Sequence, residues 1–173
     1  MRVAVIACLL SLGGCVDRTV EGNAAVYSFS WWVGALVVLV GLLALPLGWG
    51  LRRRSGRLMV LGLIFGPVLL LLVGPPMFLD EVRVDDRHFE GRYGVWFNPT
   101  RFNVAYADLD HVNVVTWQER TRRGGRRTKQ RLDCVGKAGA TTTIPLGDLL
   151  KHARDEVLER AHAAGVRVFE TSE

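Results

Sequence analysis

Cysteine and lysine are scarce in this sequence of 173 residues, and long stretches carry no charge at all. The three cysteines, Cys8, Cys15 and Cys134, have none of the close spacings of a metal site. Arginine supplies 19 and lysine 3 of the 22 basic residues. Such a skew often reflects the base composition of a genome, so a single arginine carries little functional weight.

Motifs that would indicate catalysis are also missing. No HExxH, GxSxG, phosphate-binding glycine loop or catalytic Cys–His pattern occurs in the sequence. Asp108, Asp110 and His111 include potential metal ligands, but aspartates between strands are typical of turns. Cys134 alternates with Leu132 and is expected to be a small core residue. We therefore expect a non-catalytic protein that holds no metal or cofactor. An enzyme is the distant alternative.

Two long uncharged runs, 31–51 and 58–79, dominate the first half of the chain. About 21 residues at about 1.5 Å each give about 31 Å, which is enough to cross the hydrocarbon core of a bilayer. Tryptophans near both ends of the first run suit the headgroup region. The runs predict a two-helix transmembrane hairpin joined by the arginine loop 52–57, in preference to a buried helical pair of a soluble protein.

Gly62 and Gly66 stand at GxxxG spacing in the second run. Small residues one turn apart allow two helices to approach closely in lipid, so these glycines are candidate helix-packing residues. Their expected partner is the first helix, which offers small residues of its own: Gly34, Gly41 and Ala44. Ordinary glycine content of a membrane helix is the alternative. Gly74-Pro75-Pro76 is expected to end the regular helix.

The N-terminal segment 1–15 has the layout of a secretory signal, with one arginine, an apolar run and small residues before Cys15. Its end, Leu12-Gly13-Gly14-Cys15, resembles the bacterial lipobox. That resemblance implies cleavage and lipidation of Cys15. An uncleaved third membrane segment with an incidental Cys15 is the alternative. Residues 16–30 are interpreted as a short, outward-facing polar linker.

Charge on the two sides of the predicted hairpin sets its orientation. Four arginines in the loop 52–57 mark the cytoplasmic side. The residues after the second run are mostly acidic: Asp80, Glu81, Asp85 and Asp86. We therefore expect the N-terminus and the C-terminal domain to face outward from a bacterial cytoplasmic membrane, the side on which a lipobox cysteine would be modified.

After residue 79 the apolar residues alternate with a period of two, which predicts about six antiparallel strands. Turn signals fall at 98–100 and 108–110 and at Gly124-Gly125, which suits a two-residue hairpin turn. Residues 148–164 are predicted to form one amphipathic helix, with Asp148 as its N-cap and Gly165 as its stop. Residues 166–169 are either a last short strand or a tail. The predicted fold class is α+β.

The segment Trp96–Val115, WFNPTRFNVAYADLDHVNVV, and the helix that closes the chain resemble bacterial pleckstrin-homology-like domains beside transmembrane hairpins. The resemblance covers about half the chain and implies a small antiparallel sheet or barrel capped by a C-terminal helix in 80–173. Two features depart from it. Six strands are predicted where the family usually has seven, and many relatives place the domain in the cytoplasm.

One hairpin is strongly basic. Seven cations surround the Gly124-Gly125 turn: Arg120, Arg122, Arg123, Arg126, Arg127, Lys129 and Arg131. Together they make a positive field that suits phosphates or carboxylates, and membrane lipid headgroups lie within reach of a domain with almost no linker. A solvated hairpin enriched in arginine by codon bias is the alternative. The hairpin has no stacking aromatics, so we expect no nucleic-acid binding.

These features predict a non-catalytic membrane lipoprotein whose domain binds anionic lipid or a partner membrane protein near the bilayer. The alternative is a structural subunit of an envelope complex, assembled or self-associated through its transmembrane helices at the GxxxG face.

Overall fold

The fold comes from a computed structural model that describes residues 16–50, 56–120 and 124–172. The chain divides into two compact units. The first holds the two long apolar helices and residues Arg92–Thr100, and the second holds most of the strands and the C-terminal helix. The fold class is α+β, as predicted.

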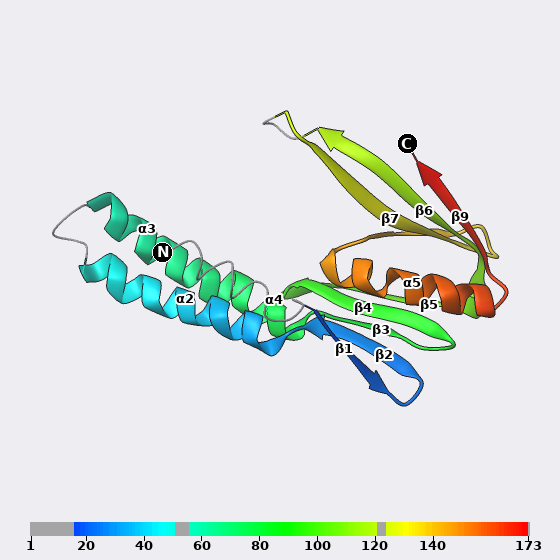
Figure 1. The fold of residues 1–173 in the computed structure, drawn as a ribbon, viewed down its shortest axis with the longest axis horizontal. Coiled ribbons are helices and arrows are strands. Elements are labelled where there is room, and N and C mark those ends of the chain that lie inside the picture. Colours follow the sequence, from blue (N-terminus) through cyan, green and yellow to red (C-terminus); the bar gives the residue numbers. More distant parts are fainter. Residues whose placement is uncertain (1–15, 51–55, 121–123, 173) are drawn as a thin grey trace, which may run out of the picture. The chain divides into compact units, whose positions relative to one another are not determined.

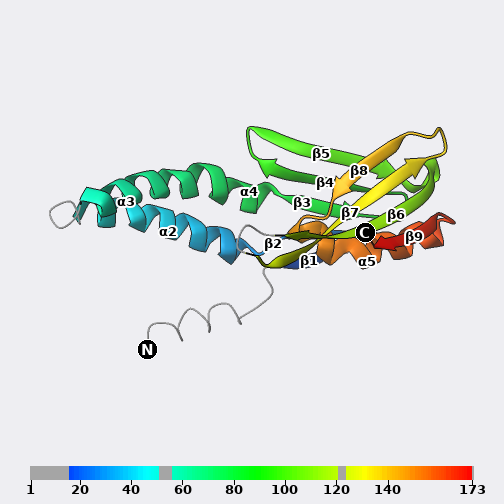
Figure 2. The same ribbon diagram turned by 90° about the horizontal axis from the view of Figure 1, so that it is seen from above.

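Two apolar helices form most of the first unit and run side by side in both views (Figures 1 and 2). The first is α2, Trp31–Gly50. The second combines α3 (Gly56–Val68), the π-helical turn η2 (Leu69–Val73) and α4 (Gly74–Leu79). Each is long and apolar enough to cross a membrane.

Gly74-Pro75-Pro76 does not end the second apolar helix, contrary to the prediction from these residues; the helix reaches Leu79, the last residue of the uncharged run. Gly74, Pro75 and Pro76 belong to α4, which continues to Leu79. Proline lacks an N–H and its ring crowds the carbonyl four residues earlier, so an ordinary helix would kink here. Instead the hydrogen bonds widen to a π pattern, and the Gly74 N–H donates to the Leu69 carbonyl. The wider turn lets the helix accommodate both prolines.

The interpretation of residues 16–30 as a linker was wrong. Strand β1 spans Val16–Glu21 and strand β2 spans Ala24–Phe29, with Gly22 between them at φ 63°. These strands enter a five-stranded sheet in the order β1-β2-β3-β4-β5. Because β2 lies between two other strands and buries Ala24–Tyr27, this short segment is part of the domain core.

The remaining strands of the five-stranded sheet follow the apolar helices in sequence. They are β3 (Glu81–Val84), β4 (His88–Val95) and β5 (Asn98–Ala105). A short 3-10 turn, η3, at Tyr106–Asp108 leads to the second sheet. The predicted turn at 98–100 is displaced, because these residues already belong to β5 and the turn lies at Trp96-Phe97.

A four-stranded sheet has the order β8-β7-β6-β9. Its antiparallel strands are β6 (Leu109–Arg120), β7 (Arg126–Gly136) and β8 (Thr141–Pro145), whereas β9 (Arg167–Ser172) runs parallel to β6. Residues 166–169, left open as strand or tail, therefore contribute a strand. The described residues after residue 80 contain seven strands, one more than predicted, and the extra one follows the helix.

Helix α5, Asp148–Ala163, packs its apolar face into the core of the second unit. The buried helical residues are Leu149, Leu150, Ala153, Val157 and Ala161. Asp148 is the first helical residue and Gly147 takes the N-cap position, so the predicted cap was one residue too late. The helix ends as predicted, with Gly165 at φ 80°. The core side chains of both sheets include Phe89, Val112 and Leu132, all fully buried.

Candidate functional site

The basic hairpin is formed by two strands. Strand β6 ends at Arg120, and strand β7 begins at Arg126. These two arginines face each other across the strands, and Arg127 faces Glu119. Residues 121–123 lie outside the described residues, so the two-residue turn at Gly124-Gly125 stays a prediction; Gly124 takes a positive φ of 80°. Like charges directly opposite each other raise the local positive potential.

Two of the predicted cations of this hairpin have partners. Lys129 forms an ion pair with Glu119 on the facing strand. Arg131 bonds Asp133 at 3.1 Å, and its guanidinium lies 5.5 Å from the centre of the Trp117 ring. Among the described residues, Arg120, Arg126 and Arg127 are exposed and have no ion pair. The available positive charge therefore concentrates at the outer end of the hairpin.

Several predicted site residues lie outside the described part of the chain. These are Arg122 and Arg123 of the hairpin, Cys15 with the whole segment 1–15, and the arginine loop up to residue 55. Their roles stay predictions.

The two packing glycines lie where the apolar helices face each other. A Cβ placed on Gly62 would come within 2.7 Å of the Gly48 Cα and 2.8 Å of the Ala44 carbonyl oxygen. A Cβ on Gly66 would lie 3.0 Å from the Gly41 carbonyl oxygen. Gly34, Gly41 and Gly48 are the buried residues of α2, one every seven residues. The helices therefore approach along a continuous line of small residues.

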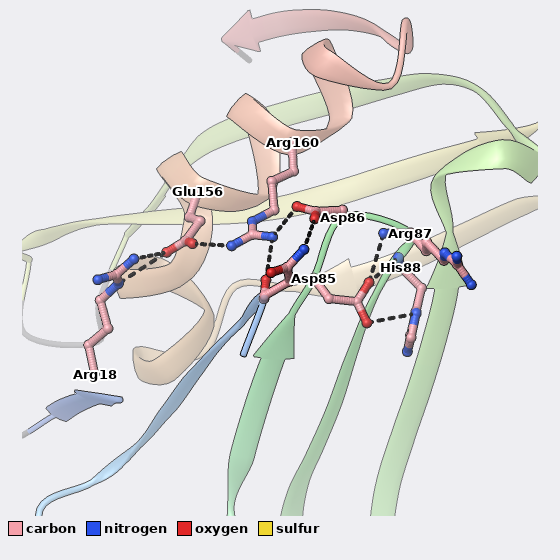
Figure 3. Close-up of polar contacts among 8 residues, drawn as sticks. Arg18, Asp85, Asp86, Arg87, His88, Glu156 and Arg160 are labelled. Atoms are coloured by element: carbon pink, nitrogen blue, oxygen red, sulfur yellow. Dashed lines mark hydrogen bonds and ion pairs between the residues drawn. The ribbon is translucent and has the colours of Figure 1, made fainter. Parts of the chain in front are cut away.

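A polar cluster that the sequence did not reveal joins α5 to the N-terminal strands (Figure 3). Its centre is Glu156, whose side chain is 14% exposed. One carboxylate oxygen accepts bonds from the Tyr27 hydroxyl at 2.7 Å and from Arg18 at 3.0 and 3.1 Å. The other accepts from Arg160 at 2.8 Å. Only the Glu156–Arg160 pair, four residues apart on one helix, was predictable from spacing.

Arg160 extends this cluster to the turn after β3. Its Nη1 donates to Asp86 at 2.6 Å and to the Asn23 carbonyl at 2.8 Å. The Asn23 amide in turn donates to Asp86 at 3.0 Å. Figure 3 shows Arg18, Glu156, Arg160 and Asp86 in one alternating chain of charges. The chain ties three segments that are distant in sequence.

The cluster has the electrostatics of a structural site. Burial by itself would raise the pKa of Glu156, but the bonds from Tyr27, Arg160 and Arg18 outweigh it and lower the pKa to about 2. A carboxylate held ionised by three donors is a poor general base near neutral pH. The arrangement therefore stabilises the fold of the second unit.

A second unpredicted site lies in the first unit, at the turn between β4 and β5. The Trp96 indole Nε1 donates to the Leu71 carbonyl at 2.8 Å, and the Gly94 N–H donates to Asp80 at 3.2 Å. Burial raises the pKa of Asp80 to about 6, against the opposing effects of the Gly94 bond and the charge of Arg92. Two adjacent prolines and an adjacent Trp-Phe pair were the sequence signals for this contact.

The remaining candidate groups are held in local pairs. His111 bonds Asp110 at 2.8 Å, and Asp110 also binds Arg167. Burial and the charge of Asp133 raise the pKa of Cys134 to about 12, so its thiol is protonated at neutral pH. The described residues include no group of three or more His, Cys, Asp or Glu side chains that could hold a metal ion.

No protein-family model matches the chain, and no curated protein matches it.

Proposed function

We propose that the chain is a membrane-anchored, non-catalytic binding protein that contacts anionic lipid headgroups through its basic β6–β7 hairpin. The two apolar helices cross the bilayer, and the domain after residue 79 works next to it. The lipobox-like Cys15 and the outward orientation belong to the same proposal, as does the pleckstrin-homology-like character of the domain. Antiparallel sheets and a C-terminal helix support that likeness, and the parallel strand β9 departs from it.

The observation that carries the proposal is the exposed apolar surface of the helical pair. Glycines lie on the face between the helices, where Leu45, Leu70 and Phe78 pack against them, whereas many other large apolar side chains of the pair are exposed. Those more than half exposed in this unit include Leu39, Leu47, Ile64, Phe65 and Leu71. Water would make such a surface costly, because each square ångström of exposed apolar area costs about 25 cal/mol. A bilayer covers it.

The chain has almost no spacer between the helical pair and the domain. Helix α4 ends at Leu79 and strand β3 begins at Glu81. A domain attached in this way starts at the membrane boundary, where each nearby cation contributes about 1 kcal/mol toward anionic lipid. Arg120, Arg126 and Arg127 are the described cations best suited to that role, since their charges are exposed.

A lipid-binding measurement tests this role on the full chain. The purified protein in neutral nanodiscs is titrated with a soluble short-chain phosphatidylglycerol and, separately, with the matching phosphatidylcholine. We expect preference for the anionic lipid, and a loss of at least about tenfold when Arg120, Arg126 and Arg127 are changed together to Gln.

The matched control removes three exposed charges elsewhere in the second unit, at Arg87, Lys137 and Lys151. This control variant should retain the preference for the anionic lipid, because the preference is expected to depend on the hairpin cations and not on the total positive charge. Equal binding of both lipids by the natural chain, or equal losses in both variants, would rule out the hairpin as the lipid site. A phosphatase fusion at Glu173 and acyl labelling of a Cys15→Ser variant test orientation and lipidation.

The alternative, assembly of a larger complex through the GxxxG face, has less support. Gly62 and Gly66 face α2 of the same chain, so this face is already occupied. An assembly of that kind would need another surface of the helical pair.

A further inference from the structure

The turn between β4 and β5 carries two exposed aromatic side chains. Trp96 is 48% exposed and Phe97 62% exposed, and their rings meet edge to face with centres 5.6 Å apart. Residues 93–100 contain no charge, whereas Arg92 and Arg101 flank them on either side. We name residues 93–100 the aromatic tip. An uncharged aromatic turn bordered by arginines suits a membrane interface.

The Trp96 indole bonds a carbonyl that the second apolar helix cannot satisfy by itself. The Leu71 carbonyl would accept from residue 75 in an α-helix and from residue 76 in a π-helix. Both positions are proline and have no N–H. Trp96 Nε1 donates to this oxygen at 2.8 Å. The aromatic tip thus supplies a donor for a helix carbonyl that would otherwise have no partner, because the acyl chains of lipid cannot donate a hydrogen bond.

A second bond holds the base of the tip at the end of the same helix. Gly94, at φ 108°, donates its N–H to the Asp80 carboxylate at 3.2 Å. Asp80 directly follows Leu79, the last residue of α4. The two bonds therefore fix the aromatic tip along the final turns of the helix, over the span from Leu71 to Asp80.

This span sets the depth of the tip. Leu79 lies eight positions after Leu71, which corresponds to about 12 Å along a helix axis. Side chains of this span are exposed and apolar, including Leu71, Leu72 and Phe78. If lipid covers those side chains, it also covers the indole that lies on the Leu71 carbonyl. Interfacial elements commonly enter the bilayer by about 5–10 Å, which agrees with a tryptophan that reaches down from a turn.

We infer that the aromatic tip is a third membrane contact, which inserts Trp96 and Phe97 into the upper acyl region of the leaflet next to Leu79. The inference rests on the proposed membrane location of the helices, and its ligand is the lipid bilayer. The contact would hold the start of the sheet against the membrane through apolar burial, which salt does not screen, in addition to the cationic hairpin.

Fluorescence quenching in proteoliposomes tests this insertion. Three single-tryptophan forms of the full chain keep only Trp96, Trp49 or Trp117, with Phe at the other four tryptophans. Each is reconstituted in phosphatidylcholine and phosphatidylglycerol vesicles that carry bromine near the carbonyl end or near the middle of the acyl chains. Trp49 reports the helices and Trp117 the second sheet. A further form with Trp96→Phe and Phe97→Trp preserves an aromatic tip if the first form misfolds.

Insertion predicts loss of about half of the Trp96 emission with bromine near the carbonyl end, and less with bromine near the chain middle. Trp49 should also be quenched, and Trp117 should not. Quenching of Trp49 but not of Trp96 or the Phe97→Trp probe would overturn the inference and leave the membrane location standing. A tip shielded from both bromine and aqueous iodide would also overturn it, because protein would then cover the tip. Absence of quenching at Trp49 would refute the membrane location itself.

Discussion

The two units of this chain differ in which side chains they bury and which they expose. In the first, the buried residues of α2 are glycines, and many large apolar side chains of the helical pair are exposed. In the second, residues such as Phe89 and Leu132 fill the interior. Charged residues such as Glu156 and Arg160 line its surface in ion pairs. This difference supports the proposed lipid surroundings of the helical pair. For a protein in water, the burial of apolar side chains is favourable, whereas in lipid an apolar side chain gains nothing when it moves from the lipid to the protein interior.

The comparison also shows where each unit is sensitive. Close backbone approach makes the helical pair depend on the absence of side chains at a few positions. The β-unit instead depends on polar contacts between segments that are distant in sequence. Substitutions that add one methyl group should therefore be most damaging in the first unit, and substitutions that remove one charge should matter more in the second.

The largest effect is expected from Gly62→Ala. The added Cβ would lie 2.7 Å from the Gly48 Cα, and backbone cannot move away as a flexible side chain could. We expect a loss of about 2–3 kcal/mol in the stability of the helical pair, measured by thermal unfolding in detergent. The control is Gly50→Ala, since a Cβ at Gly50 meets nothing within 4 Å. Similar melting temperatures for the two variants would contradict the close packing of the helices.

Glu156→Gln should destabilise the second unit by about 2 kcal/mol, because it leaves Arg18 and Arg160 without their shared carboxylate. The control is Glu159→Gln, an exposed position on the same helix. Denaturant unfolding at neutral pH measures both. Equal stability of the two variants would show that the cluster contributes nothing.

The same carboxylate predicts a pH dependence. Its pKa is lowered from 4.5 to about 2 in the folded chain, so its contribution is fully present above pH 4.5. The contribution should fall as the pH falls toward about 2, where the folded form also takes up the proton. Acid unfolding of the Glu156→Gln variant should lack this component, and an unchanged acid transition would argue against the assigned pKa.

Trp96→Phe should cost about 1 kcal/mol by removing the donor to the Leu71 carbonyl. The sharper test is a double-mutant cycle with Pro75→Ala, which restores a backbone N–H four residues after Leu71. We expect Trp96→Phe to cost less in the Pro75→Ala background, as measured by thermal unfolding in detergent. Additive effects of the two changes would mean that the indole does not replace the missing donor.

Asp80→Asn should have an effect of the opposite sign, an increase in stability. Burial raises the pKa of Asp80 from 3.8 to about 6, so ionised Asp80 destabilises the fold above that pH. Stability linked to Asp80 is therefore greatest below pH 3.8 and is lost as pH rises to about 6. The variant should gain about 1 kcal/mol at pH 7, after allowance for solvent screening, and lose this pH dependence. Glu81→Gln, at an exposed neighbour, should show neither change.

The elements predicted best were those with a strong local pattern. Uncharged runs located both apolar helices, and an apolar stripe with Gly165 located α5 and its end. Turn positions were less well predicted, because Asn98-Pro99-Thr100 has turn composition but belongs to β5. The aromatic pair before it forms the turn instead.

The sequence by itself determined the helices, the alternation of the strands and the concentration of cations around Gly124, because each depends on neighbours along the chain. Only the tertiary structure decided that residues 16–29 join the sheet, that Glu156 binds Arg18, and that Trp96 reaches Leu71. These contacts join residues 25 to 138 positions apart, and no local pattern encodes such pairings. Their energy comes from polar groups that find partners only after the segments between them have folded.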